Sequence, residues 1–236
     1  MKKLMIFLTT LVMLGMNGLA VAQEPNPSHP IGGTAGASSL SAPSVVKIKH
    51  TWERVEGNLA YRTSVPSLGT VIGPHTILSH NHFDASMGNL PNESMVFIDN
   101  SGKSVSVRYA DMKATPIDGG TMLFSLPGNL AVAAAPIANR STIDSLTVGD
   151  WLTVHYWDDA AERFAQQDFQ IIRIRNGIAT LADPDRVING GDSGGGAYFE
   201  GKLVGNNWSV NEDQNGNSLD SFNVALLPLQ VADLVQ

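Results

Sequence analysis

A serine framed by glycines stands in the run Gly191-Asp192-Ser193-Gly194-Gly195. A serine hydroxyl is a weak nucleophile, which needs a general base beside it and donors that hold the oxyanion formed when it attacks a carbonyl. Glycines around the serine allow a tight turn that aims backbone N–H groups outward. The pattern predicts acyl-transfer chemistry with Ser193 as nucleophile and the N–H groups of Gly191 and Ser193 as the oxyanion hole, although a glycine-rich turn of a β-protein is the structural alternative.

The candidates for the general base lie in a short histidine-rich segment that follows an apolar strand. Histidine suits this role because its charge changes near neutral pH. The segment runs from Gly73 to His82 and contains His75, His80 and His82. We expect His75 to be solvated in the preceding turn, which leaves His82 and His80 as candidates.

These two segments together resemble the chymotrypsin-like (trypsin-like) serine proteases of the bacterial secreted type. In that family a strand ending in an apolar pair and Ser or Thr leads to the base, and Ile77-Leu78-Ser79 is such a run, so the resemblance places the base at His82. Gly195-Gly196-Ala197, followed by the run from Gly201 to Gly205, resembles the strand-turn-strand after the nucleophile. The resemblance implies a secreted serine endopeptidase that forms an acyl-enzyme on Ser193 and takes a polypeptide as substrate.

The third member of a catalytic triad is less regular. The family places an aspartate directly before an apolar strand, between the histidine and the serine, to hold the imidazole in the correct tautomer. The matching strand is Met122-Leu123-Phe124, and Asp118 precedes it with Gly119-Gly120-Thr121 between them. We predict Asp118 as the orienting carboxylate, with Asp111 or no normal aspartate as alternatives. A protease-fold binding module that has lost turnover is therefore the alternative function.

Substrate-binding residues follow from the same resemblance. They are one residue at the base of the specificity pocket and three on a strand that should pair with the substrate backbone: Val187, Asn207, Trp208 and Ser209. Val187 favours an apolar or small substrate residue, whereas Asp183 and Asp185 leave a basic one open.

Asp192 needs a partner, because a carboxylate beside the nucleophile should be partly buried and a buried charge is costly when unpaired. In many family members the partner is a new N-terminus made by cleavage, and Ile31-Gly32-Gly33 resembles such a start. Pro30 precedes it, which argues against trypsin-like activation. An internal Arg or Lys is an equal alternative.

The elements that position these residues are short apolar segments separated by turns, which predict strands. The first set is Val45–Lys49, Leu59–Val65, Leu68–Ile72, Met95–Asp99, Val105–Tyr109 and Thr121–Leu126. The second set is Leu152–Trp157, Phe169–Arg175, Ile178–Leu181, Ala197–Glu200, Leu203–Trp208 and Phe222–Leu226.

This pattern predicts an all-β fold of two six-stranded antiparallel barrels, chymotrypsin-like, with a short C-terminal helix in residues 227–236. We expect a protease domain over residues 44–236, with an N-terminal barrel at about 44–127 and a C-terminal barrel at about 148–226. Residues 127–150 form a bridge rich in Pro, Gly and Ala.

The N-terminus predicts export. Lys2 and Lys3 precede an apolar run, and Ala20-Val21-Ala22 is a small-x-small cleavage site, so residues 1–22 are a predicted signal peptide, with an uncleaved anchor as the alternative. Residues 23–43 are rich in Pro, Gly and Ser and are predicted to be a linker or pro-segment. The mature protein should be extracellular or periplasmic and no longer attached to a membrane.

Composition excludes several function classes. The chain of 236 residues has no cysteine, which excludes disulfides, a catalytic cysteine and thiolate metal sites. Its net charge of -7, without a basic block, argues against nucleic acid as a partner. A partial calcium-loop pattern over residues 211–217 has Phe222 where the bidentate Glu should stand, so a hairpin turn at Asn215-Gly216 is the better interpretation. We expect no metal and no cofactor, and a monomer.

Overall fold

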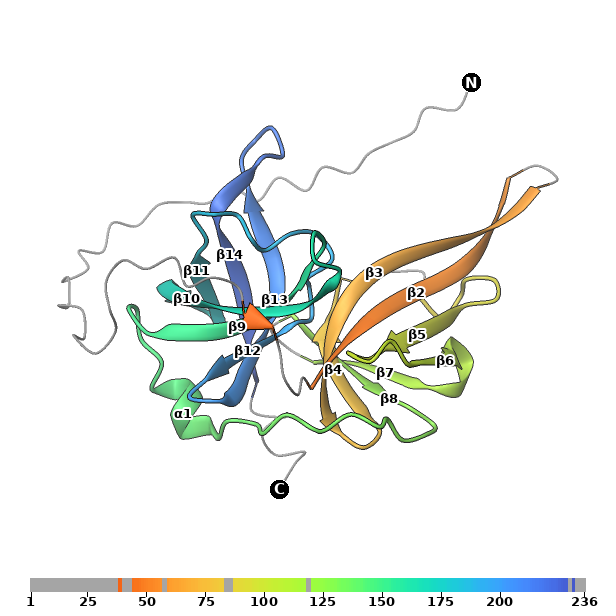
Figure 1. Ribbon diagram of the computed structural model, residues 1–236, viewed down its shortest axis with the longest axis horizontal. Coiled ribbons are helices and arrows are strands. Elements are labelled where there is room, and N and C mark those ends of the chain that lie inside the picture. The colour runs from red at the N-terminus through yellow and green to blue at the C-terminus, as the bar shows by residue number, and fades with distance from the viewer. Residues whose placement is uncertain are drawn as a thin grey trace. The chain divides into compact units, whose positions relative to one another are not determined.

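The computed structural model describes residues 44–56, 59–82, 87–117, 120–228 and 231, together with the strand at 38–39. Its described strands form two antiparallel sheets (Figure 1). The predicted signal peptide, most of the predicted linker, and Asp118 lie outside the described residues.

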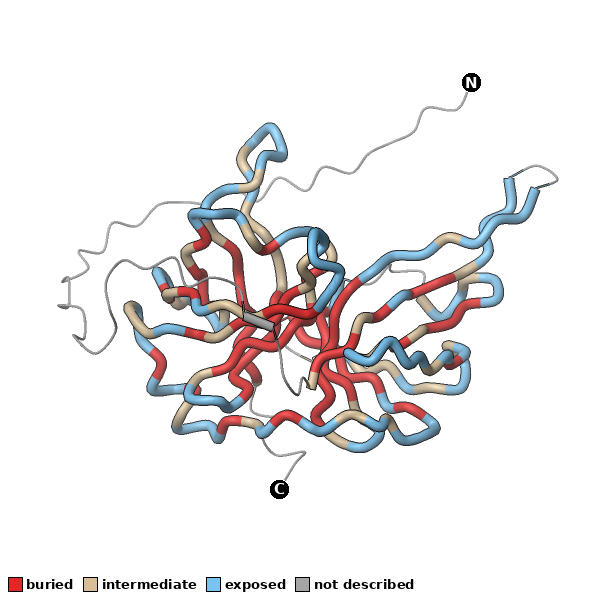
Figure 2. The backbone as a smooth tube through the Cα atoms, viewed as in Figure 1, coloured by how far each residue is buried: buried red, intermediate tan, exposed pale blue. Residues whose placement is uncertain are grey.

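The first sheet has the strand order β6-β5-β2-β3-β4-β8-β7. Its strands are β2 (Val45–Glu56), β3 (Leu59–Gly73), β4 (Thr76–His80), β5 (Ser94–Ile98), β6 (Ser104–Arg108), β7 (Lys113–Ile117) and β8 (Thr121–Ser125). Buried Val46 and Ile48 alternate with the less buried Lys47 and Lys49 along β2, so the face with Val46 and Ile48 packs into the core of the first sheet. The outer part of the β2–β3 hairpin is exposed (Figure 2).

The second sheet has the order β1-β10-β11-β14-β13-β12-β9, and a further pairing of β9 with β10 closes six of its strands into a barrel. Its strands are β1 (Ser38–Ser39), β9 (Trp151–Asp158), β10 (Arg163–Arg175), β11 (Ile178–Ala182), β12 (Gly196–Phe199), β13 (Lys202–Glu212) and β14 (Ser218–Leu226). The inward side chains of this barrel build a core that includes Leu152, Ile171, Leu181, Leu203 and Phe222.

Two short helices complete the described elements. The 3-10 helix η1 (Tyr109–Asp111) follows β6, and α1 (Arg140–Asp144) lies in the segment between the sheets. Asn139 caps α1, since its side chain accepts a hydrogen bond from the Thr142 N–H. This helix was not predicted from the bridge composition.

The predicted all-β architecture with two antiparallel sheets is confirmed, with differences in detail. Only the second sheet closes; within the described pairings, the first is a curled open sheet with β6 and β7 at its edges. The two predicted strands on either side of Pro66 are one strand, β3. The short strand β1 falls in the predicted linker, and most of the predicted C-terminal helix lies outside the described residues.

Prolines explain why two strands were misjudged. Pro66 pairs with Lys49 of β2, but β4 joins the other edge of β3 only from Thr70 onward, so the missing proline N–H lies where no partner strand needs it. Pro116 lies in β7, which the sequence did not predict and which is an edge strand. Edge positions tolerate proline because one side of an edge strand has no ladder partner.

Candidate active site

The turn that carries Ser193 precedes β12 and depends on two glycines with positive φ. Gly191 has φ 106° and Gly194 has φ 92°, a region that favours glycine. A Cβ on Gly194 would collide with the Leu68 carbonyl oxygen and the Ser79 hydroxyl. The glycine frame is therefore a geometric requirement of a turn that packs directly against the first sheet.

Hydrogen bonds fix this turn to the first sheet. The Leu68 N–H of β3 donates to the Ser193 carbonyl at 2.8 Å, and the Ser79 hydroxyl of β4 donates to the Leu68 carbonyl at 2.6 Å. On the other side, the Gly194 N–H donates to the Asn207 carbonyl of β13 at 2.8 Å. The structure therefore places the nucleophile candidate beside the strand whose end leads to His82.

His82 lies just beyond β4, and its ring is partly exposed. Its backbone N–H donates to Nδ1 of His80 at 3.0 Å, and its ring centroid lies 5.3 Å from that of Trp208. Partial burial lowers the pKa of His82 below its ordinary value. A neutral imidazole at neutral pH is the form that a general base requires.

His80 has a different environment from His82. It pairs with Thr121 of β8 and is only 6% exposed. Burial, with a smaller contribution from His82, lowers the pKa of His80 to about 3. Since its Nδ1 already accepts the His82 N–H, His80 supports the backbone of the base candidate.

The Ser193 hydroxyl is held only loosely. Its Oγ lies 3.5 Å from the Trp208 carbonyl oxygen, beyond the 2.5–3.0 Å of an ordinary O–H···O bond. Among the described residues, no hydrogen bond joins it to His82. Catalytic hydrogen bonds without substrate are often long and tighten when substrate binds.

The oxyanion-hole candidates have free donors. Neither the Gly191 N–H nor the Ser193 N–H donates to an acceptor within the part of the chain that the structure describes. Neighbouring backbone groups hold the turn instead. The Asp192 N–H donates to the Asn189 carbonyl at 3.1 Å, and the Gly195 N–H donates to the Asp192 carbonyl at 3.0 Å. The arrangement can offer two donors to an anionic oxygen.

The Asp192 carboxylate is buried and bound by two backbone N–H groups. Trp157 donates to its Oδ1 and Asn189 to its Oδ2, both at 2.8 Å. Burial raises the pKa of Asp192 to about 6, against the opposing effect of these two donors. Neither predicted type of partner is bound to it: no described Arg or Lys forms an ion pair with Asp192, and Ile31 lies outside the described residues.

Gly120 occupies the position directly before β8, where the family pattern has its aspartate. Its φ is 103°, and a Cβ there would lie 2.7 Å from two atoms of the Trp208 indole. The Gly120 carbonyl accepts the Asn81 N–H at 3.2 Å, and the Asn81 side chain accepts the Trp208 Nε1–H at 3.2 Å. A glycine therefore allows the indole to pack against the loop that carries His82, and Asp118 stays a prediction.

The alternative carboxylate, Asp111, is engaged elsewhere. It forms a two-point pair with Arg108, at 2.7 and 3.0 Å, on the exposed surface of β6 and η1. This ion pair gives Asp111 a structural role on the surface.

The predicted pocket base lies in a turn organised by Asp183. The half-buried Val187 donates its N–H to one Asp183 carboxylate oxygen, and Ile188 donates to the other, both at 2.9 Å. Asp183 is only 3% exposed, so its charge is used inside the turn. Asp185 is exposed. This favours the apolar or small pocket over one in which Asp183 binds a basic residue.

Asn207 differs from its prediction as a substrate-binding side chain. It is 2% exposed, and its Nδ2 donates to the carbonyls of His155 and Asp192 at 3.1 and 3.3 Å. Its backbone N–H and carbonyl are bonded to Gly195 and Gly194. Asn207 therefore positions the nucleophile turn, and its side chain is too deeply buried to meet a substrate.

The next residues of β13 are better placed for a substrate. Strand β12 pairs with β13 only as far as Asn206, so beyond this point that edge of β13 has no partner among the described strands. Trp208 is half-buried, and the Ser209 hydroxyl accepts from Asn223 of β14 at 3.0 Å. The open edge can accept an extended peptide as an added strand.

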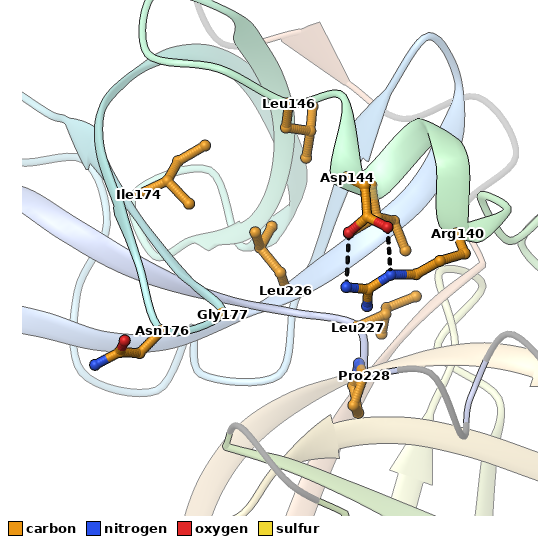
Figure 3. A pocket seen from close by; sticks show the side chains of 10 residues that line it. Arg140, Asp144, Leu146, Ile174, Asn176, Gly177, Leu226, Leu227 and Pro228 are labelled. Carbon is orange, nitrogen blue, oxygen red and sulfur yellow. Dashed lines mark hydrogen bonds and ion pairs between the residues drawn. The ribbon is translucent and has the colours of Figure 1, made fainter.

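A cavity of about 360 Å³ lies away from these residues, at α1, the β10–β11 turn and the end of β14 (Figure 3). Arg140 and Asp144 form an ion pair at 2.6 Å in its wall, and Leu226 and Leu227 supply apolar surface. Neither His80 nor His82 lines this cavity, and Ser193 does not line it either. It is therefore separate from the candidate active site.

Comparison by sequence finds no relatives: no family model matches the chain, and no curated protein does. Solved structures do match. The HtrA-type protease AlgW with a tripeptide matches with a TM-score of 0.55 and 16% identity, over 82% of this chain and 59% of that chain. An AlgW variant with a tripeptide matches with a TM-score of 0.57 and 15% identity, over 83% and 61%.

A scabies mite inactivated protease paralogue also matches, with a TM-score of 0.58 and 12% identity, over 81% of this chain and 93% of that one. The chain spans about three fifths of the length of the HtrA-type structures it matches. At these identities the likeness shows the fold alone. The two-sheet architecture is that of the chymotrypsin-like serine proteases, as the sequence motifs predicted.

Proposed function

We propose that the protein is a serine endopeptidase in which Ser193 is the nucleophile and His82 the general base. One observation carries the proposal. The glycine-framed Ser193 turn is bonded through Leu68 to Ser79, three residues before His82, while the N–H groups of Gly191 and Ser193 have no described acceptor.

In the proposed reaction, the Ser193 Oγ attacks the scissile carbonyl carbon as its proton passes to the His82 imidazole. The N–H groups of Gly191 and Ser193 stabilise the oxyanion. The His82 imidazolium returns the proton to the leaving amine, which leaves an acyl-enzyme ester. Water, deprotonated by His82, then hydrolyses the ester. Asp118 is the proposed orienting carboxylate for His82.

An activity-based label tests the nucleophile. We expect an organophosphonate to label the purified protein, and Ser193→Ala to abolish both labelling and nearly all peptide hydrolysis without unfolding the protein. Ser106→Ala, on the exposed face of β6, is the matched control and should behave as wild type. Unchanged hydrolysis by Ser193→Ala would remove the basis of the proposal.

The base assignment is tested by comparing two histidines. His82→Ala should lower kcat/KM by about 10³-fold or more, as expected for a general base that acts in concert with its nucleophile. His80→Ala should lower it by less than about tenfold, because the His80 ring supports the backbone of His82 through a hydrogen bond and acts on catalysis indirectly. The reverse ranking would assign the base to His80.

We also propose that the protein is exported as a monomer after removal of residues 1–22 and acts on polypeptides outside the cytoplasm. The proposal rests on the basic and apolar N-terminal run and on its small-x-small site. In the described part of the chain, no helix is long and apolar enough to cross a membrane.

A second candidate function is a protease-fold binding module without turnover. Gly120 in place of a carboxylate before β8 favours it, as does the Ser193 hydroxyl directed at the Trp208 carbonyl. One matched solved structure is described as an inactivated protease paralogue. A folded wild-type protein that resists organophosphonate labelling and hydrolyses no peptide would support this candidate over the endopeptidase.

A further inference from the structure

A cavity of about 290 Å³ lies between β2 of the first sheet and β9 and β10 of the second. It is separate from the proposed catalytic residues. Its lining combines cationic and aromatic residues with one turn carboxylate, and includes Lys47, Lys49, Asp99, Trp157, Arg163 and Phe164.

Three cations converge on this cavity. Lys47 and Lys49 are two apart in β2, so both project from the face opposite Ile48, and Arg163 begins β10. Of the ion pairs among the described residues, none involves Lys47, Lys49 or Arg163. Burial lowers the pKa of Lys47 and Lys49 adds to this effect, while the carboxylates of Asp159, Asp192 and Glu162 oppose it. Cations that line a cavity without a direct ion-pair partner attract an anion.

The lining also holds two acidic residues, Asp99 and Glu162, and neither forms an ion pair with these three cations. The Asp99 carboxylate accepts three hydrogen bonds within its own turn, from the Ser101 N–H and hydroxyl and from the Lys103 N–H, at 2.6 to 3.0 Å. Glu162 is exposed, which leaves its charge in contact with water.

The cavity also has an aromatic wall. Trp157 and Phe164 are direct cross-strand partners, with ring centroids 5.1 Å apart at 84°. Phe164 is 3% exposed, and the Lys47 Nζ lies 3.7 Å from the Trp157 ring centroid. Such a wall suits a flat or apolar group, whereas the cations suit a negative head group.

Trp157 connects this cavity to the nucleophile turn. Its indole lines the cavity, while its backbone N–H donates to the Asp192 Oδ1 at 2.8 Å. Asp192 directly precedes Ser193 and is also within electrostatic reach of Lys47. A ligand against Lys47 and Trp157 therefore acts on a buried carboxylate of the turn.

We propose that this inter-sheet cavity binds a small organic anion, a carboxylate or phosphate joined to a flat apolar body, and that the bound anion changes the electrostatic environment of Asp192. The cations bind the head group and the aromatic pair contacts the body. Neither part of the proposal requires that the protein hydrolyse peptides.

The binding test uses phenyl phosphate and benzoate as probes, with the full chain carrying Ser193→Ala to prevent self-cleavage. Isothermal titration should show saturable binding of at least one probe, and the indole N–H signal of Trp157, assigned with Trp157→Phe, should shift. Lys47→Met should weaken binding about tenfold or more, the loss expected for one charge-assisted contact. Lys202→Met, which replaces an exposed lysine on β13, is the control and should bind as the parent does.

Two results would overturn the proposed binding site: neither probe binds at millimolar concentration, or Lys47→Met binds the probe as tightly as Lys202→Met.

The connection between the cavity and Asp192 is measured separately, by NMR titration of the Asp192 carboxyl carbon signal. Saturation with the probe should raise the pKa of Asp192, because added negative charge disfavours the ionised form. The exposed Asp213 serves as the unmoved reference. An unchanged Asp192 titration in the saturated protein would disprove the connection.

Discussion

Lowering the pH from about 7 to about 5 should destabilise the protein through two buried histidines. Burial lowers the pKa of His80 from 6.5 to about 3 and that of His155 from 6.5 to about 4, so both remain neutral in the folded state. In the unfolded chain each binds a proton below its ordinary pKa. The unfolded state therefore gains protons, and the free energy of unfolding falls as the pH drops.

Asp192 opposes this effect. Its pKa is about 6 in the folded protein against an ordinary value of 3.8, so between these values the folded state binds the extra proton and gains stability as the pH falls. Between pH 7 and pH 5, each histidine lowers the free energy of unfolding by about 2 kcal/mol, and Asp192 raises it by about 1 kcal/mol. The histidines dominate, and the net fall in the free energy of unfolding is about 2–3 kcal/mol.

Urea unfolding at the two pH values, followed by tryptophan fluorescence on the Ser193→Ala protein, measures this loss. Asp192→Asn removes the opposing contribution, so the difference between pH 7 and pH 5 should grow to about 4 kcal/mol, whatever the variant costs at either pH. The reasoning is refuted if the parent protein is as stable at pH 5 as at pH 7, or if Asp192→Asn reduces the difference.

Three further predictions concern the loop before β8 and the N-terminus. Asp118→Asn should keep the fold but lower kcat by roughly 10⁴-fold, because an amide favours the wrong imidazole tautomer, whereas Asp111→Asn should be nearly silent; full activity in both variants would make the enzyme a His-Ser dyad. Gly120→Ala should lower the free energy of unfolding by about 1–3 kcal/mol through positive φ and contact with the Trp208 indole, and an unchanged unfolding midpoint would contradict this. Intact mass of the secreted protein should correspond to a chain that begins at or after Gln23, and retention of residues 1–22 would disprove the signal peptide.

The sequence predicted those features of the fold and site that depend on a local pattern of residues. Alternating apolar residues predicted most strands, since a strand with one buried face must repeat every two residues. The glycines around Ser193 predicted a tight turn, and their positive φ values show why glycine is needed there. The strand of His80 was not among the predicted strands, although its apolar pair was used to locate His82.

The features that the sequence did not predict depend on hydrogen bonds that no local pattern of residue types indicates. Asp192 was expected to need a charged partner, but it is bound by backbone N–H groups of Trp157 and Asn189, and every residue except proline has such a donor. Asn207 stands where a substrate contact was expected, yet its amide satisfies carbonyls inside the fold. Only the three-dimensional course of the chain decides which polar groups are satisfied internally.

The backbone N–H and carbonyl of Leu68 determine how the site could come apart. Its N–H is bonded to the Ser193 carbonyl and its carbonyl to the Ser79 hydroxyl, so one residue of β3 ties the second sheet to the first at the nucleophile. A fluctuation that opens β3 would separate the proposed nucleophile from its base while leaving the closed barrel intact. The hydrogen-exchange rate of this single amide should therefore report the fraction of molecules whose site is assembled. A protease built this way would lose activity before it loses most of its structure.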